Sequence, residues 1–157
     1  MHFTGYSEHT IDAKQRLAIP AKYRAQWDEK RDGTAWYGVP WPGGLLRLYT
    51  ETMFDALAEQ MGSRSLAPSR DEASLDAGIF GFAERLEMDK QGRVALPRHH
   101  LELTGLAGDV AVIGAGNRLE VYDRAAYQAA RQGMFERLPD VADRMRNGRA
   151  PGADTAK

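Results

Sequence analysis

The chain repeats one ten-residue stretch, which reads IDAKQRLAIP at residues 11–20 and MDKQGRVALP at residues 88–97, 77 positions later. Both copies place an aspartate second, an arginine sixth, an apolar–small–apolar triplet next and a proline last. The match extends further, because RLYT at 47–50 and EVYD at 120–123 each precede a segment with a helical pattern. A repeat of this kind indicates that one supersecondary unit occurs twice in the fold.

Each unit has the pattern of two strands around a polar turn, a short helix and two further strands. Apolar residues near each turn predict four short strands, at 6–11, 17–19, 82–88 and 94–96. The two strands around each turn form a candidate hairpin. Proline suits the first position of the two helices that should follow, at about 20–28 and 97–103. The remaining strands are predicted at 36–39, 45–49, 110–113 and 118–122.

The repeats also organise the chain as a whole. We predict a first repeat at 6–54, a helical connection at 55–82, a second repeat at 83–127, and a C-terminal helix end with a disordered polar tail at 128–157. Thr50 and Asp123 are candidate N-caps, since their side-chain oxygens can accept hydrogen bonds from a first helical turn. Ser69 and Glu72 form a capping box for a helix in the connection, after a linker at 62–68.

Composition limits the classes of protein. The 157 residues include 43% hydrophobic ones, enough to bury a core, and the formal net charge is −1. This charge argues against a histone-like binder but not against a local basic patch. The absence of cysteine excludes disulfides and thiolate metal sites. Because the sequence has no apolar run of about 18 residues and no signal-peptide pattern, we expect a soluble, cytoplasmic protein.

Basic charge gathers at the two Asp-x-x-x-Arg turns and the helices after them. Residues 12–24 carry a net charge of +3, and residues 89–100 carry +2 with neutral histidines. The aspartate can accept backbone N–H bonds and pair with the arginine four residues on, which fixes the turn and directs basic groups outward. Such a turn could hold DNA through phosphates and base edges. The alternative is that the pair only locks a tight turn and that the lysines are solvated.

Three segments resemble the bacterial MraZ family, at residues 8–24, 88–97 and 113–123. They occur in the family's order and spacing, and the likeness covers about residues 1–130. The resemblance implies an α+β fold in which two tandem AbrB-like swapped-hairpin repeats form one double-psi-type β-barrel with flanking helices. It also implies a nucleoid-associated transcriptional regulator, with repression the expected effect. The regulator would be a ring-shaped homo-oligomer that binds double-stranded DNA at short direct repeats in the promoter of the division-and-cell-wall operon.

The resemblance also assigns roles to residues. The Asp-x-x-x-Arg loops would contact DNA, with Lys14 and Arg16 as primary contacts and Arg93 as their counterpart in the second loop. Asp12 and Asp89 would organise the loops. Three further basic residues near the loops complete the predicted DNA-binding set: Lys22, Arg24 and Lys90.

One position departs from the family's pattern. Glycine usually precedes the motif's arginine, as Gly92 does, but the first copy has Gln15. A backbone with positive φ would cost Gln about 1 kcal/mol there, or the loop would change shape. The basic residue also shifts between the copies, because Lys90 occupies the place of Ala13, so the second loop could contact DNA differently or not at all.

Two other classes of protein remain open. One is a structural or interaction module whose loops make subunit contacts. The other is an enzyme on a double-psi barrel, which would have a deep polar pocket with carboxylates or histidines of perturbed pKa. The sequence offers no catalytic set, metal site or cofactor motif, and we expect no small-molecule substrate and no membrane partner. The adjacent His99 and His100 would point about 100° apart on a helix and could not chelate one metal from one face.

Overall fold

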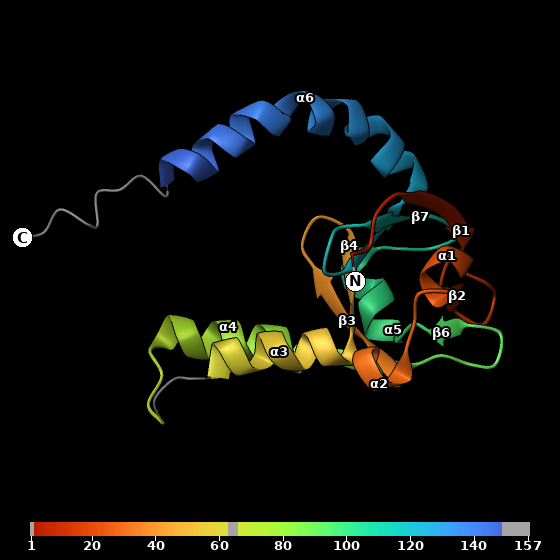
Figure 1. Ribbon diagram of the computed structural model, residues 1–157, viewed down its shortest axis with the longest axis horizontal. Helices are drawn as coiled ribbons and strands as arrows, with labels where there is room; N and C mark the ends of the chain where they lie inside the picture. The colour runs from red at the N-terminus through yellow and green to blue at the C-terminus, as the bar shows by residue number, and fades with distance from the viewer. Residues whose placement is uncertain (1, 63–65, 149–157) are drawn as a thin grey trace, which may run out of the picture. The chain divides into compact units, whose positions relative to one another are not determined.

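The computed structural model describes residues 2–62 and 66–148 (Figure 1). The described residues up to Arg124 form one compact unit, which contains the strands of both sequence repeats, and those from Ala125 form a second unit. Residues 63–65 of the predicted linker, and the predicted tail beyond Gly148, lie outside the described residues.

The strands of the two repeats correspond one to one. The first repeat contains β1 (Tyr6–Thr10), β2 (Arg16–Ala18), α1 (Ala21–Arg24), α2 (Glu29–Asp32), β3 (Ala35–Trp41) and β4 (Leu45–Thr50). The second contains β5 (Glu84–Glu87), β6 (Arg93–Ala95), α5 (Arg98–Thr104), β7 (Asp109–Gly114) and β8 (Leu119–Asp123). Between them lie α3 (Glu51–Gly62) and α4 (Arg70–Phe82), and α6 (Arg124–Gly148) follows. All eight predicted strands are confirmed, with ends within two residues of those expected.

The strands pair between the repeats. The larger sheet is antiparallel with the order β1-β7-β8-β4-β3-β5, and β2 pairs with β6 in a separate two-stranded ribbon. The first strand of each repeat therefore pairs with the third of the other, as β1 with β7 and β5 with β3. Equivalent strands meet in the pairs β4–β8 and β2–β6. This pattern has an approximate two-fold symmetry, and it interlocks the repeats.

The candidate hairpins are wrong beyond the turns themselves. Each turn is closed by its own backbone hydrogen bonds, but the strands on its two sides belong to different sheets. The periodicity of apolar residues shows where a strand runs, whereas its partner is selected by the core that the two repeats bury together.

The repeated stretch supplies the centre of that core. Leu17 and Val94, which are equivalent residues of the two copies, face each other across the ribbon and are 1% and 0% exposed. One hydrophobic cluster contains residues of both repeats, among them Trp36, Leu48 and Val112. Burying each such side chain contributes about 1.5–3 kcal/mol, so neither repeat would retain this core alone.

Strands β1 and β5 are the two edges of the larger sheet, and within the described residues they do not pair with each other, so this sheet is open. Together with the helices, the two antiparallel sheets make a mixed α+β fold. The pairing of β2 with β6 places the two Asp-x-x-x-Arg turns at opposite ends of one ribbon.

Several helix limits differ from those expected. The helix predicted at 20–28 ends at Arg24, and a separate α2 begins after Asp28, whose carboxylate accepts from the N–H of Lys30 at 2.9 Å. Pro20 and Pro97 occupy the N-cap positions rather than the first helical position. Apart from these shifts, helices α1 and α5 stand where the sequence placed them.

The predicted caps of the connecting helices are present. The hydroxyl of Thr50 accepts from the N–H of Met53 at 3.1 Å, and the hydroxyl of Ser69 accepts from the N–H of Glu72 at 3.2 Å. Helix α6 continues to Gly148, with Pro139 inside it. None of the described helices combines the length and the apolar character that a membrane crossing requires.

Candidate nucleic-acid interface

The first Asp-x-x-x-Arg turn is held by the side chain of Asp12. The N–H of Gln15 donates to the carbonyl of Asp12 at 2.9 Å, and the N–H of Asp12 donates to the carbonyl of Arg16 at 3.0 Å. One carboxylate oxygen of Asp12 accepts from the N–H groups of Lys14 and Arg16, both at 2.9 Å. The other accepts from Nε of Arg16 at 2.8 Å. These bonds satisfy the carboxylate and fix the turn and its arginine together.

The second turn repeats this arrangement bond for bond. Asp89 accepts from the N–H groups of Gln91 and Arg93 at 2.9 and 3.0 Å, and from Nε of Arg93 at 2.8 Å. The backbone N–H of Arg93, followed by its side chain, lowers the pKa of Asp89, and Arg16 does the same for Asp12. Both carboxylates are therefore ionised at neutral pH, which is the state that holds an arginine.

Gln15 keeps the loop shape at an energetic cost. Its φ is +63°, close to the +75° of Gly92 at the equivalent position, and it is the only residue other than glycine with positive φ in the described chain. Of the two outcomes that the sequence left open, the structure therefore has the strained glutamine and not an altered loop. The cost is about 1 kcal/mol for a residue with a Cβ.

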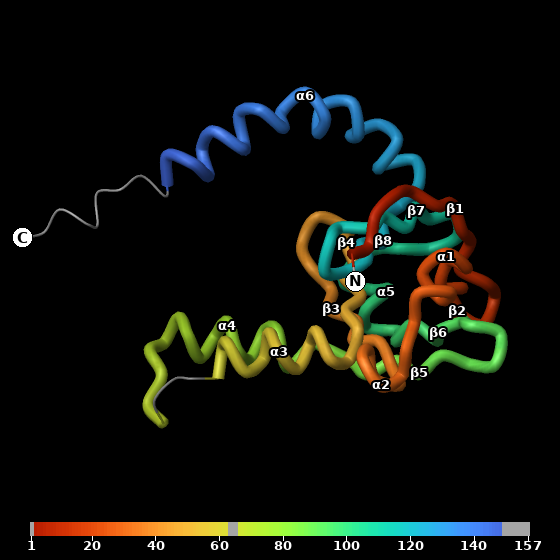
Figure 2. Tube along the Cα trace, viewed as in Figure 1, coloured from red at the N-terminus to blue at the C-terminus, as the bar shows by residue number. Residues whose placement is uncertain are grey.

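The two loops are joined through the ribbon. The carbonyl of Gln15 accepts from the N–H of Leu96 at 2.8 Å, and the carbonyl of Gly92 accepts from the N–H of Ile19 at 2.9 Å. Figure 2 shows both turns projecting beyond the ribbon of β2 and β6, on one side of this view. Each turn therefore bonds to the residue that directly follows the other turn's strand, Leu96 after β6 and Ile19 after β2. These bonds fix the spacing between the two turns.

The arginine of each loop bonds to its aspartate through Nε and keeps its Nη groups available. The side chains of Arg16 and Arg93 are 29% and 27% exposed, and each gives only its Nε to the aspartate. Their Nη groups donate to no atom of the described residues. Lys14 and Lys90 are exposed on the turns. Each loop thus presents an oriented guanidinium edge and an exposed ammonium, and both groups can donate hydrogen bonds to phosphates and to guanine edges.

Two of the predicted DNA-binding residues, Lys22 and Arg24, make contacts within the protein. Lys22 directs its ammonium to the carbonyl of Tyr6 at 3.3 Å and lies 5.0 Å from the ring centroid of Tyr23. Arg24 donates from Nε to the carbonyl of Ile19 at 2.9 Å. Lys22 is therefore engaged with the first residue of β1 and not with either turn.

Arg24 packs against the second loop, although it follows the first in the sequence. Its guanidinium lies against Gly92, where a Cβ would collide with the Arg24 side chain. The candidate interface thus contains residues of both repeats, because Arg24 on α1 of the first repeat covers the turn of the second. This contact gives Gly92 a second requirement besides its positive φ, namely room for the arginine.

A second surface was not foreseen from the sequence. Five large apolar side chains are 38% to 54% exposed around α4 and the end of β3: Trp41, Leu75, Phe80, Phe82 and Leu103. We call these residues the apolar surface. Hollows between them are lined also by Pro40 and Ile79. Trp41 is partly exposed, with the Arg47 guanidinium 4.7 Å from its ring centroid, while Trp36 is buried. The signal available in the sequence was the apolar content of residues 75–82.

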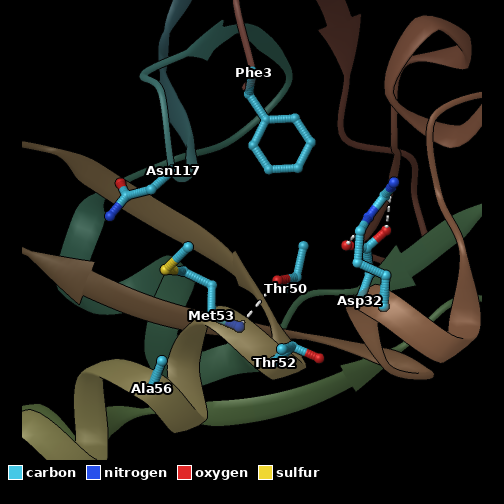
Figure 3. A pocket seen from close by; sticks show the side chains of 8 residues that line it. Phe3, Asp32, Thr50, Thr52, Met53, Ala56 and Asn117 are labelled. Carbon is cyan, nitrogen blue, oxygen red and sulfur yellow. Dashed lines mark hydrogen bonds and ion pairs between the residues drawn. The ribbon is translucent and has the colours of Figure 1, made fainter. Parts of the chain in front are cut away.

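The pocket in Figure 3 bears on the enzyme alternative. It is lined by Phe3, Thr50, Met53 and Asn117, with Asp32 on one wall. Asp32 is 4% exposed, and it accepts from the Arg31 guanidinium at 2.8 Å and from the N–H of Asp28 at 2.9 Å. Burial raises the pKa of Asp32, but these donors outweigh it and the net shift is downward. The Asp32 carboxylate is therefore ionised at neutral pH and is held by hydrogen bonds from its own neighbours.

His100 has a structural role. It is 0% exposed on α5, and its Nε2 lies 2.6 Å from the carbonyl of Phe82. Burial lowers its pKa, so the ring is neutral at pH 7. His99 lies 3.6 Å from Glu84, and its ring contacts that of His100 with the centroids 4.5 Å apart. No group of three or more metal-binding side chains converges in the part of the chain that the structure describes.

Known proteins are similar to the chain over nearly its whole length. Residues 79–146 match the family described as "MraZ protein, putative antitoxin-like". A protein named transcriptional regulator MraZ from Pelodictyon phaeoclathratiforme is 31% identical over 149 residues, covering 90% of this chain and 97% of the relative. Relatives of the same name from Leuconostoc citreum and Chlorobium luteolum are 30% and 29% identical and cover 90% of this chain, and 94% and 97% of their own lengths are aligned.

Proposed function

Because the chain belongs to the MraZ family, we propose that it is a transcriptional regulator that binds double-stranded DNA through its two Asp-x-x-x-Arg loops. The observation that carries this proposal is the identical hydrogen bonding of the two loops, which leaves the arginine Nη groups free of bonds to the described chain. A structural turn needs the aspartate's backbone bonds. It does not need two exposed lysines and two oriented guanidinium edges as well.

The arginines and lysines take different roles. Arg16 and Arg93, held at Nε, would present their Nη groups to guanine O6 and N7 in the major groove or to one phosphate. Lys14 and Lys90 would contact the flanking phosphates and fix the register of the protein on the duplex. Arg24 would support the second loop from behind. Lys22 would add charge but no directed contact.

The fold also supports a finer proposal about architecture. The interlocked pairing of β1 with β7 and of β5 with β3 is what two AbrB-like swapped-hairpin repeats would produce, and we propose that they form a double-psi-type barrel. The approximate two-fold symmetry then makes the loops equivalent in backbone. They differ only in their side chains, at Gln15, Gly92 and the positions of the lysines.

Oligomerisation would give so small a basic site its affinity. The chain has a formal net charge of −1, so a single pair of loops would bind weakly and lose affinity steeply with salt. We propose a ring-shaped homo-oligomer whose subunits place their loops on short direct repeats, because linked sites bind at high effective concentration. The apolar surface supports this, since exposed patches of this kind mark interfaces. Helix α6 has exposed apolar side chains of its own, at Met134, Phe135, Leu138, Val141 and Met145.

The proposed target is the promoter of the division-and-cell-wall operon, with repression as the effect. The test is a binding titration on a duplex from upstream of the protein's own coding sequence and on a scrambled duplex of equal length, each at two salt concentrations. Preference for the promoter duplex, with affinity that falls as salt rises, is the expected result. Equal or absent binding at low salt would favour the alternative, an interaction module whose loops contact other subunits.

A further inference from the structure

Gln15 is a strained residue whose strain the fold does not require. It holds φ +63° where the second loop has Gly92 at +75°. Glycine occupies such a position without strain. A strained side chain at this position therefore points to a functional role for that side chain.

The backbone of Gln15 makes the bonds that a glycine would make. Its N–H donates to the carbonyl of Asp12, and its carbonyl accepts from the N–H of Leu96. Gly92 makes the same two bonds, to Asp89 and from Ile19. The loop and the ribbon therefore need this residue's peptide groups and not its amide.

The side chain of Gln15 is presented outward. It is exposed, it lies in sequence between Lys14 and Arg16, and its amide forms no hydrogen bond with any described residue. The second loop offers no such group, because Gly92 is buried under Arg24 and a Cβ there would collide with it. Of two loops with one backbone geometry, only the first carries a side chain at this position.

We propose that Gln15 reads a base, and that it makes the first loop select adenine at one position of each DNA repeat. The amide has one donor and one acceptor side, which match N6 and N7 of adenine in the major groove, beside the base or phosphate that Arg16 contacts. This inference rests on the proposed function. It adds that sequence selectivity is divided unequally, with the first loop reading and the second mainly holding the backbone.

The experiment compares wild type, Gln15→Gly, Gln15→Glu and Arg16→Ala by selection from a duplex library randomised across the promoter repeat, followed by titration of the selected duplexes. Gln15→Gly should keep the fold and the loop backbone. It should lose about tenfold of the preference for adenine at one position, while binding to the remaining duplexes changes little. Gln15→Glu should shift the preference at that position toward cytosine, since a carboxylate only accepts.

Other outcomes would overturn the inference. An unchanged base profile in Gln15→Gly, or a uniform loss of affinity across all duplexes, would show that the amide reads no base. Wild-type protein that binds no duplex at low salt would overturn the proposed function itself, and with it this inference. Arg16→Ala distinguishes DNA binding as such from base selection, because it should weaken binding to all duplexes.

Discussion

Leu17 and Val94 face each other at the centre of the β2–β6 ribbon, one from each sequence repeat, and both are almost completely buried. They lie where the approximate two-fold symmetry relates the repeats to each other. The turns that carry the proposed DNA contacts leave this ribbon at its two ends. Packing at this pair therefore sets the relative position of the two loops.

Leu17→Ala should lower the free energy of unfolding by about 2–5 kcal/mol, because it leaves a cavity where both repeats meet. Urea denaturation followed by circular dichroism measures this. Leu66, which is fully exposed, provides the matched control, and Leu66→Ala should change the stability little. An unchanged urea midpoint for Leu17→Ala would mean that the repeats do not share this core.

Glycine exchanges in the two loops should have opposite effects. Gln15→Gly should raise the free energy of unfolding by up to about 1 kcal/mol, because it relieves the positive φ. Gly92→Ala should lower it by more than about 1 kcal/mol, since a Cβ there meets both the positive φ and the Arg24 side chain. Thermal unfolding of both variants tests the pair. Equal shifts in the same direction would contradict the assigned loop geometry.

Stability should decline in mild acid because of buried histidine. Burial lowers the pKa of His100 below its ordinary value of 6.5, and burial together with Arg124 lowers that of His9. Below pH 6.5 the unfolded chain thus binds more protons than the folded one, and the unfolding free energy falls until the folded-state pKa values are passed. Urea midpoints from pH 8 to pH 5.5 measure this.

The variant His100→Asn can keep a donor for the Phe82 carbonyl but has no titrating ring. Its stability should depend less on pH over the same range, with the contribution of His9 remaining. His99 and Glu84, which lie near His100, act in opposite directions on its pKa and do not remove the effect. A variant with the full wild-type pH dependence would show that His100 is not its source.

A charge on the apolar surface should disrupt assembly. Phe82→Asp places a carboxylate among Trp41, Leu103 and their neighbours, which costs several kcal/mol if another subunit covers them. Sedimentation velocity should then show smaller species than wild type, at unchanged secondary structure. Leu66→Asp, on an exposed loop, is the control. Identical sedimentation of Phe82→Asp and wild type would remove the apolar surface from the interface.

The sequence was informative about local structure. The ten-residue repeat predicted two equivalent units, and the alternation of apolar residues placed all eight strands. The aspartate four residues before each arginine predicted the turn that the structure contains. These features depend on neighbours within a few residues, so they are visible in a single chain.

Features set by distant contacts were not visible. The exchange of strands between repeats depends on the shared core, so the hairpin interpretation failed although the strands were right. The position of Arg24 over Gly92 depends on α1 meeting the other repeat's loop, which no local pattern encodes. The charge count of residues 12–24 likewise gave Lys22 on the helix after the turn the same weight as Lys14, and it did not show that the Lys22 ammonium bonds to the carbonyl of Tyr6.

The most direct test of the central claim compares Arg16→Ala with Arg118→Ala in binding to the promoter duplex. The two arginines are matched, because each gives Nε to a carboxylate at 2.8 Å and their side chains are 29% and 28% exposed, but Arg118 lies outside the loops. We predict that Arg16→Ala lowers affinity at least about tenfold and that Arg118→Ala retains wild-type affinity. Equal affinities for Arg16→Ala and wild type, with both proteins folded and assembled alike, would contradict the assignment of the first loop to DNA.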